Sequence, residues 1–336
     1  MPQASPSTDS VRWVPGAGGQ VESFFLKANN PNHPEQAFWL KFTILDPGDA
    51  YSAVAEVWAI RFPGAGVTPQ AAKQTNSASQ ASLSRDGLGF QTASCELREG
   101  KTLGRIGLGD EQICWDLEFN YDDQQIMHGL PHPWMYDASL PRNKVYTSCP
   151  STRFRGQLSV GGDSWQVDNW PGMLGHNWGR AHNPRYYWAQ CNLFDNSDCV
   201  FEGWSARLPL GPWLSPWLTG GVVRFEGQDL RFNAVAGVLN RSVQTSLFAW
   251  SGESKQEGWK MQWQVEADRE DFAGLRYTNP DGSDNFCLNS KIASAKLKLW
   301  QKHGGDWIER AHLVGRKSCA FEILVQDEDH GVPILV

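Results

Sequence analysis

The chain lacks the features of several large protein classes. Its 30 lysines and arginines are outnumbered by 37 aspartates and glutamates, which leaves a net charge of -7 over 336 residues. Nucleic acids and anionic membrane surfaces require a basic footprint, so neither is expected as a primary partner. No apolar run approaches the roughly 18 residues of a membrane helix, and membrane insertion is therefore not expected.

The first residues and the cysteines favour a cytoplasmic protein. Met1 to Ser10 are polar and contain neither the basic nor the apolar region of a secretory signal. The 7 cysteines are widely spaced and free of CxxC pairs, which favours buried, reduced thiols over disulfides or a zinc site. The triplet Asn240-Arg241-Ser242 matches an N-glycosylation acceptor, but such triplets are common by chance.

Motifs for common catalytic and metal sites are also missing. The sequence contains no GxSxG elbow, no phosphate-binding loop and no GxGxxG fingerprint. His128 and His132 are four residues apart, but Pro131 and Pro133 prevent the helix that would place both on one face. A metal site is therefore not expected.

Tryptophan and short β-rich runs are what the chain has in excess. Its 17 Trp exceed 7 Tyr and match 16 Phe, so many large apolar surfaces with one polar edge are available. Helical periodicity is scarce, and the predicted class is mainly β. The segment from Pro63 to Gly89 is expected to be a surface loop or a short helix. The expected strands are Glu22–Lys27, Ala37–Leu45, Ser52–Phe62, Glu111–Tyr121, Arg155–Val160, Tyr186–Phe194, Cys199–Leu208, Gly220–Phe225, Ser246–Trp250, Lys260–Ala267, Ala293–Trp300 and Cys319–Gln326.

Three segments of the first half recur in the same order in the second half. This order predicts an internal duplication of an antiparallel unit, each copy closing into a lipocalin-like barrel whose interior holds one small ligand. Chance alternation between β-rich stretches is the alternative. We expect a flexible N-terminus over residues 1–20 and barrels over 21–172 and 173–336. The matched segments are Phe38–Asp46 with Tyr187–Asp195, Glu56–Phe62 with Glu202–Leu208, and Gln157–Trp165 with Lys298–Trp307.

Alternation separates two faces in the matched strands. Phe38, Leu40, Phe42 and Ile44 are expected to face the core of the first copy. The opposite face mixes aromatic and hydrogen-bonding groups, so it either meets solvent or lines a ligand cavity. This mixed face carries Trp39, Lys41 and Thr43 in the first copy, and Trp188, Gln190 and Asn192 in the second.

Each copy also places a carboxyl between bulky apolar neighbours. Burial would favour the protonated form of Glu56 or Glu202, as a general acid requires. The alternative is a structural ion pair with another strand's cation or with the arginine of the same half, Arg61 or Arg207.

The densest group of polar and aromatic residues lies between the copies, from Asp168 to Trp188. Glycines and prolines punctuate it, so we expect a loop, the kind of segment on which functional residues concentrate. In the alternative, structural interpretation, Trp170 and Trp178 close barrel ends while His176 and Asn177 cap backbone groups.

Two strings in this region resemble the signature of the carotenoid hydratase (hydroxyneurosporene synthase) superfamily: Gly-His-Asn-Trp-Gly over 175–179 and Tyr-Tyr-Trp-Ala-Gln over 186–190. That superfamily has two lipocalin-like β-barrel domains and includes fungal Diels–Alderases; tocopherol cyclase-like proteins are similar. Specific matches run mainly from Asp168 to Arg207. Members with this signature often have an Asp directly before the His, where this chain has Gly175, and Asp168 is the alternative carboxyl.

The resemblance implies an apolar substrate, no organic cofactor and a reaction shaped by the cavity. A hydratase needs a strong acid and aromatic faces that stabilise a cation, whereas a pericyclic cyclase needs mainly a folded substrate and a polarising hydrogen bond. A Trp-rich cavity with few ionisable groups favours a cyclase of the Diels–Alderase type acting on a polyene, terpenoid or polyketide-derived substrate. The alternative is a lipocalin-like protein that only binds a lipophilic small molecule.

The candidate residues follow from these patterns. The segment Pro209–Trp217 is either a flexible lip over a barrel mouth or an ordinary turn. The expected partner is a hydrophobic small molecule, and the protein is expected to be a monomer or a homodimer. The candidate catalytic residues are Asp168, His176, Asn177, Gln190 and Glu202, and the candidate substrate-binding residues are Trp170, Trp178, Arg180, Trp188, Asn192, Trp204, Trp213 and Trp217.

Overall fold

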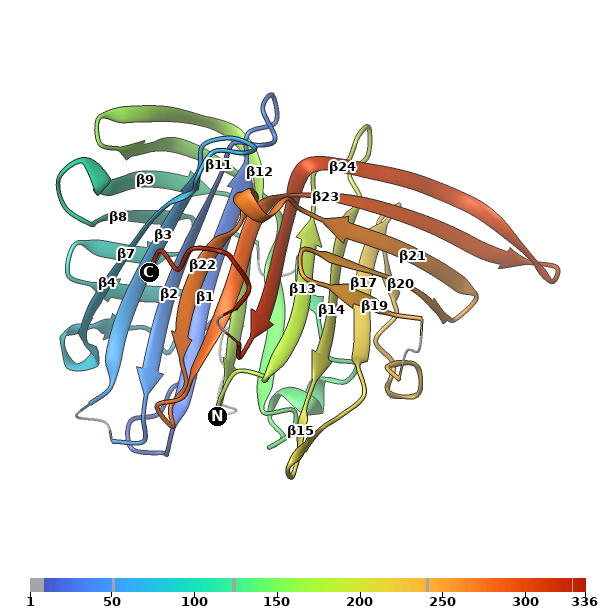
Figure 1. Cartoon of the computed structure of the whole chain (residues 1–336), viewed down its shortest axis with the longest axis horizontal. Helices are drawn as coiled ribbons and strands as arrows, with labels where there is room; N and C mark the ends of the chain where they lie inside the picture. The colour runs from blue at the N-terminus through green and yellow to red at the C-terminus, as the bar shows by residue number, and fades with distance from the viewer. Residues whose placement is uncertain (1–8, 50–51, 123–124, 240–241, 328) are drawn as a thin grey trace, which may run out of the picture.

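Two curled antiparallel sheets stand side by side in the computed structural model (Figure 1). The structure describes residues 9–49, 52–122, 125–239, 242–327 and 329–336. The prediction of a mainly β protein is confirmed. Residues 1–8 of the expected flexible N-terminus and two members of the glycosylation triplet, Asn240 and Arg241, lie outside the described residues. Within the described ranges, no helix has the length and apolar character needed to cross a membrane.

The first sheet contains most of the first half of the chain. Its edge strands do not pair with each other within the described ranges, so it is a half-barrel of the lipocalin-like type. Strand β10 (Met127–His128) pairs with the start of β11 beside the main path. In spatial order the other strands are β4 (Gln70–Ser77), β3 (Val54–Phe62), β2 (Ala37–Asp46), β1 (Gln20–Asn29), β12 (Asp163–Gly179), β11 (Asn143–Val160), β9 (Ile113–Phe119), β8 (Lys101–Ile106), β7 (Cys95–Arg98), β6 (Gly89–Thr92) and β5 (Ser82–Leu83).

The second sheet repeats this arrangement with shorter edges. Strand β22 (Ala273–Thr278) pairs with the start of β23 beside the main path, and β15 (Pro209–Leu210) and β16 (Trp213–Leu214) form a separate hairpin. In spatial order the other strands are β18 (Gln228–Arg231), β17 (Leu218–Phe225), β14 (Val200–Arg207), β13 (Arg185–Cys191), β24 (Asp306–Val325), β23 (Asp284–His303), β21 (Trp259–Glu266), β20 (Ala249–Gln256) and β19 (Gln244–Ser246). Short 3-10 turns are η1 (Ala78–Gln80), η2 (Gly109–Glu111), η4 (Pro133–Tyr136), η5 (Val235–Gly237) and η6 (Arg269–Asp271).

The strand order of the two sheets bears out the duplication and corrects its alignment. The path β4-β3-β2-β1-β12-β11-β9-β8 has the same connectivity as β18-β17-β14-β13-β24-β23-β21-β20. Strand β13 therefore takes the place of β1, and β14 that of β2. Sequence similarity had matched β13 with β2 and β14 with β3, one strand away, because all of these strands share one environment and hence one Trp-and-polar alternation. The long hairpins β11–β12 and β23–β24 were matched as the topology has them.

Two segments that were expected to be irregular contain strands, although the first also includes the 3-10 turn η1. Residues 70–77, in the segment expected to be a loop or helix, pair along their length with β3 as the edge strand β4. Their low β propensity is overridden by this pairing. The segment from Asp168 to Gly179 is not a loop but the second part of β12. Its glycines allow close packing rather than turns, because a Cβ on Gly172 would lie 2.2 Å from the carbonyl oxygen of Lys27.

The chain passes from the first sheet to the second after β12 ends at Gly179. It enters β13 at Arg185, so the changeover lies beyond the expected boundary between 172 and 173. Part of the N-terminus is held in place, because the backbone N–H groups of Arg12 and Trp13 donate to the Glu22 carboxylate at 2.8 and 2.6 Å.

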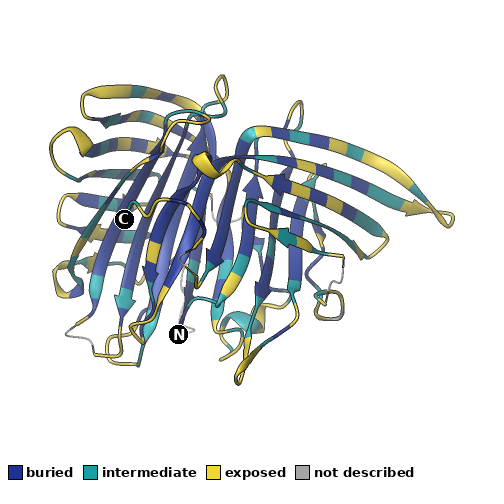
Figure 2. Cartoon of the chain, viewed as in Figure 1, coloured by how far each residue is buried: buried dark blue, intermediate teal, exposed yellow. Residues whose placement is uncertain are grey.

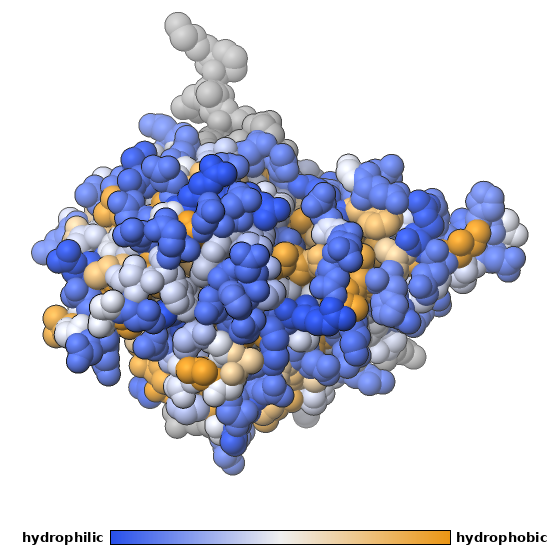
Figure 3. Space-filling model, turned by 90° about the horizontal axis from the view of Figure 1, so that it is seen from above, coloured by the Kyte–Doolittle hydropathy of each residue, from blue (hydrophilic) through white to orange (hydrophobic). Residues whose placement is uncertain are grey.

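Each sheet curls around its own apolar core, and a third apolar cluster lies between the sheets. Phe38, Leu40, Phe42 and Ile44 lie in the first core, as predicted. Burial is continuous along the central strands, and exposed residues lie at the turns and along the outer parts of the long hairpins (Figure 2). Seen from above, the surface is mainly hydrophilic with small apolar patches (Figure 3). The cluster between the sheets contains Phe25, Trp39, Trp58, Ile60, Phe62, Met173, Trp188, Leu275, Tyr277, Cys287, Ile292 and Leu324 among its members.

Candidate functional site

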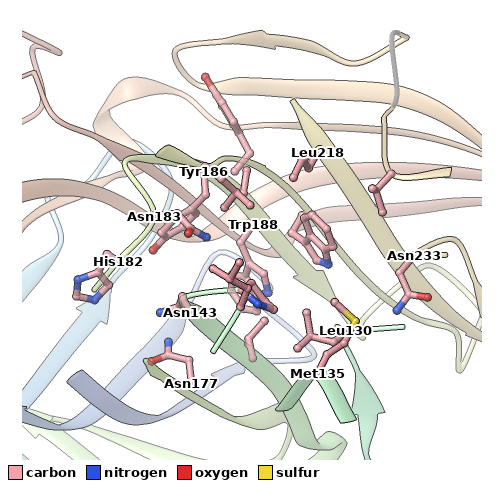
Figure 4. Close-up of a pocket in the computed structure, with 18 of the residues that line it drawn as sticks. Leu130, Met135, Asn143, Asn177, His182, Asn183, Tyr186, Trp188, Leu218 and Asn233 are labelled. Atoms are coloured by element: carbon pink, nitrogen blue, oxygen red, sulfur yellow. The ribbon is translucent and has the colours of Figure 1, made fainter. Parts of the chain in front are cut away.

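A cavity of about 590 Å³ lies between the two sheets rather than inside either half-barrel (Figure 4). A ligand site inside a barrel was expected, but the inner faces are filled by the two apolar cores. Phe25 and Trp39 form the wall on the side of the first sheet, and Trp188 and Trp204 form it on the side of the second. The outer faces of the sheets therefore build the site.

Two rows of paired residues, one in each sheet, contribute to these walls. In the first sheet, Lys41 of β2 lies between Phe25 of β1 and Trp58 of β3. In the second sheet, Trp188 of β13 lies between Glu322 of β24 and Trp204 of β14. The rings of Phe25 and Trp188 meet edge to face at 5.7 Å, so the two rows approach each other.

The second row contains a carboxyl where the first row has none. Phe25 pairs with Gly175 of β12, and Trp188 pairs with Glu322 of β24. Strand β24 takes the place of β12 in the repeated topology, so Gly175 and Glu322 lie on equivalent strands of the two sheets. Glu322 thus brings a carboxyl to the cavity from the second sheet.

Glu322 is held by a set of donors that leaves it facing the cavity. Its Oε1 accepts hydrogen bonds from Lys291 Nζ at 2.8 Å and Asn289 Nδ2 at 3.0 Å. Its Oε2 accepts from the Tyr186 hydroxyl at 3.4 Å. Burial, together with the nearby Cys287 and Glu322, raises the pKa of Tyr186 well above its ordinary value, so this phenol stays protonated.

Lys41 is the cation of the cavity wall. Its Nζ lies 3.7 Å from the centre of the Tyr277 ring and 5.8 Å from that of Trp58. Burial lowers the pKa of Lys41 to about 8, and the negative charge of Glu322 opposes this effect. The ammonium is therefore the main form at neutral pH, while the neutral amine is within reach.

His182 supplies a neutral imidazole. Its backbone N–H and its Nδ1 both lie against Asn279 Oδ1, at 2.9 and 3.0 Å, which assigns the ring proton to Nδ1. Its Nε2 has no hydrogen-bond partner among the described residues. Burial lowers the pKa of His182 to about 3, with a further contribution from the charge of Lys41, so the ring is uncharged at neutral pH.

A proline-rich cover closes the cavity beside the second sheet. The segment 129–141 is held there because Trp204 Nε1 and Asn233 Nδ2 donate to the carbonyl oxygen of Gly129 at 3.3 and 3.1 Å. Two cavity-lining residues of this cover, Trp134 and Leu140, are 63% and 66% exposed. An apolar molecule thus meets apolar side chains at the rim of the cavity.

Three of the candidates from the sequence line the cavity, and others lie behind it. Asn177, Trp188 and Trp204 belong to its lining. Glu202 is buried behind Trp188, whose Nε1 donates to Glu202 Oε1 at 3.0 Å. Burial raises the pKa of Glu202.

Gln190 and Asn192 join the sheets and do not line the cavity. Gln190 Nε2 and Asn192 Nδ2 donate to the carbonyl oxygen of Pro150 at 3.0 and 3.1 Å. Asn192 Oδ1 accepts from Lys27 Nζ at 3.0 Å. These side chains thus bind β13 to the β11–β12 hairpin and to β1.

His176 and Trp178 belong to a separate buried network that holds the N-terminal segment. His176 Nε2 lies 2.8 Å from Glu22 Oε1, and its Nδ1 lies 3.0 Å from the Tyr146 hydroxyl. Arg12 stacks over the Trp178 ring at 4.3 Å. This geometry gives both residues a role in packing against β1 and the N-terminal segment.

The remaining candidates lie elsewhere. Asp168, Arg180 and Trp213 are exposed. Trp170 is in the first core, stacked on Phe38, and Trp217 packs edge-on against Tyr187. None of the five belongs to the cavity lining.

The expected ion pairs differ in their partners. Glu56 pairs with Lys73 at 2.7 Å rather than with Arg61, which pairs with Asp163. Arg207 donates to the carbonyl oxygen of Ser215 at 2.8 Å rather than to Glu202. Among the described residues, no three His, Cys, Asp or Glu side chains are arranged to hold a metal ion.

The comparisons with known proteins agree with this fold. Residues 149–323, just over half of the chain, match the model of the tocopherol cyclase-like family. The chain belongs to this family. The matched residues include the second row, with Trp188, Trp204 and Glu322, whereas Phe25 and Lys41 lie outside the match.

Individual relatives extend the comparison over more of the chain. An uncharacterised protein of Mycobacterium tuberculosis is 24% identical over 298 residues, which cover 87% of this chain and 84% of that protein. The chloroplastic tocopherol cyclase of Zea mays is 27% identical over 155 residues, 44% of this chain and 31% of that protein. The crystal structure of a candidate AttH protein from Nitrosomonas europaea has a TM-score of 0.59 and 11% identity, covering 96% of this chain and 99% of that one. This last likeness shows the fold alone.

Proposed function

We propose that the protein closes a ring within a lipophilic substrate bound in the cavity between the sheets. The observation that carries the proposal is the cavity itself: aromatic walls from both sheets with an ammonium, a neutral imidazole and a carboxylate among the lining residues. Membership of the tocopherol cyclase-like family supports the reaction class. The proposal keeps the cofactor-independent chemistry and the cytoplasmic location predicted from the sequence.

Ring closure within one molecule is an isomerisation, so its atoms balance without a second substrate or an oxidant. One new bond forms at the expense of a π bond, and a proton lost by a closing hydroxyl group returns to the carbon framework. The Glu322 carboxylate is the acceptor available for that proton, and Lys41 is the donor. The walls hold the chain in a folded conformation and lower the entropic part of the barrier. The faces of Trp39 and Trp188 stabilise positive charge by about 0.5–2 kcal/mol each.

The proposal is tested by incubating the protein with polyprenyl phenols and conjugated polyenes and analysing the products by mass spectrometry and NMR. We expect a product of unchanged mass that contains one more ring. Ala206→Phe, which places a ring at the cavity lining, is expected to abolish turnover, whereas Ala17→Phe on an exposed turn leaves it intact. Recovery of every bound compound unchanged would instead indicate the alternative function, storage or delivery of a lipophile.

A further inference from the structure

We infer that the cavity selects lipophiles carrying an anionic or carbonyl oxygen, and that Lys41 Nζ is the group that binds this oxygen. The inference deepens the proposed function and rests on its assignment of the cavity to a lipophilic substrate. Binding of a carbonyl oxygen by an ammonium would also stabilise negative charge that develops there during ring closure.

The first observation is that Lys41 is a buried cation without an internal acceptor. The residue is 4% exposed, and its ammonium has no hydrogen-bond acceptor among the described residues. Lysines are almost never buried to this degree unless they are paired. A ligand oxygen in the cavity would supply the missing acceptor.

The second observation is the contrast with the other two buried lysines between the sheets. Lys27 Nζ donates to Asn192 Oδ1 at 3.0 Å and to Asn29 Oδ1 at 3.3 Å. Lys291 Nζ donates to Glu322 Oε1 at 2.8 Å. Neither lysine lines the cavity. Counting only the residues that the structure describes, the lysine that reaches the cavity is thus the one of the three whose ammonium has no hydrogen-bond acceptor.

The nearby carboxylates accept hydrogen bonds or ion pairs from groups other than Lys41. Glu322 accepts from Lys291, Asn289 and Tyr186, as described above. Glu56 pairs with Lys73. The negative charges of Glu322 and Glu56 stabilise the nearby Lys41 ammonium, although neither carboxylate forms an ion pair with it.

The protonation states of the surrounding groups favour Lys41 as the switch near pH 8. Burial lowers the pKa of Lys41 to about 8. His182 stays neutral because its pKa is about 3, and burial raises the pKa of the Cys287 thiol to about 12. Oxygen binding should therefore weaken as pH rises through the pKa of Lys41. The titratable groups that face Lys41 come from several elements. They are Glu56 from β3, Lys73 from β4, His182 from the connection between β12 and β13, Tyr277 from β22, Cys287 from β23 and Glu322 from β24.

The experiment measures the affinity of the full-length protein for decanoate and decan-1-ol by tryptophan fluorescence quenching between pH 6 and pH 10. Wild-type protein is expected to prefer decanoate about tenfold at pH 7, which corresponds to about 1.4 kcal/mol. The preference should disappear by pH 10, because the amine then replaces the ammonium. Decanoate is ionised throughout this range, so the ligand itself does not titrate.

Lys41→Met should lose the preference while keeping its affinity for decanol, and it should unfold at a temperature no lower than wild type because an unpaired buried charge is removed. Lys27→Met is the matched control, since it removes a buried cation outside the cavity and should retain the preference. The pH series on unmodified protein tests the inference even if a variant does not fold.

The outcomes separate the two proposals. Equal affinity for the two probes in wild type, or a preference that persists in Lys41→Met, overturns the role of Lys41 and leaves the proposed ring closure standing. Failure of both probes to bind overturns the assignment of the cavity to lipophiles, and with it the inference.

Discussion

At the scale of single residues, Glu202 carries a pH-dependent cost. Burial raises its pKa, so the folded protein holds this proton more tightly than the unfolded chain does. The free energy of unfolding therefore falls as pH rises through the raised pKa. The carboxyl costs stability at neutral pH even though Trp188 Nε1 donates to it.

Glu202→Gln keeps an oxygen that accepts the indole N–H and removes the charge. We expect the variant to be more stable than wild type at pH 8 and equal to it near pH 4, as measured by urea unfolding. Glu253→Gln provides the control of opposite sign. Hydrogen bonds from Lys255 and Gln262 lower the pKa of Glu253, so its replacement should remove a small stabilisation at pH 8. A loss of stability in Glu202→Gln at pH 8 would show that the charged form is favoured.

Only those site residues that the alternation of side chains along a single strand assigns to one face could be predicted from the sequence. The alternation placed Trp39 and Lys41 on a face of mixed character, and both line the cavity. It could not place Glu322 there, because that carboxyl meets the first row only through the packing of strands almost 300 residues apart in the chain. His176 was selected for its motif, yet its partners are Glu22 and Tyr146.

At the scale of elements, β12 is a strand because its glycines admit close neighbours. The sequence suggests a loop, since glycine usually marks a turn. In the structure these glycines instead make room for the backbone of β1 and for the ring of Phe25. A Cβ on Gly175 would lie 2.4 Å from the Phe25 ring, and one on Gly172 would lie 2.2 Å from a backbone oxygen. An added methyl group could therefore be accommodated at Gly175 by movement of the Phe25 side chain, whereas at Gly172 the backbone of β1 would have to move.

Gly172→Ala is expected to destabilise the fold by about 2 kcal/mol or more, because the backbone of β1 must shift. Gly175→Ala is expected to cost about 1–2 kcal/mol and to weaken decanol binding, because Phe25 can turn into the cavity that it lines. Gly64→Ala, whose Cβ would meet only Val67 at 3.9 Å, should stay within about 0.5 kcal/mol of wild type. Thermal unfolding and fluorescence titration measure both effects. Equal binding losses in the two β12 variants would contradict the assignment of Phe25 as the movable wall.

At the scale of the whole molecule, the duplication could be predicted because the same hairpin and turn occur twice in the same order. The location of the cavity could not, because it depends on which faces of the two sheets meet. The outer faces carry large aromatic side chains beside a few buried ionisable groups, and each is covered by a segment of the other half. Strand β22 places Tyr277 against Trp58 of the first sheet, and Gly129 accepts hydrogen bonds from Trp204 and Asn233 of the second.

This exchange of covers predicts that neither half is stable alone. Production of residues 1–183 or 184–336 separately would expose the cluster between the sheets, including Trp39, Trp58 and Trp188. Apolar surface of this kind drives association, so each half is expected to aggregate or to bind a hydrophobic dye strongly. Co-expression should yield a soluble one-to-one complex with the dye binding of the intact chain. Gel filtration and dye fluorescence measure both properties, and a monomeric half with low dye binding and cooperative unfolding would contradict the interdependence. In that case the cavity would lie at the interface of two domains that fold independently. If the halves depend on each other, the cavity forms within one cooperative folding unit.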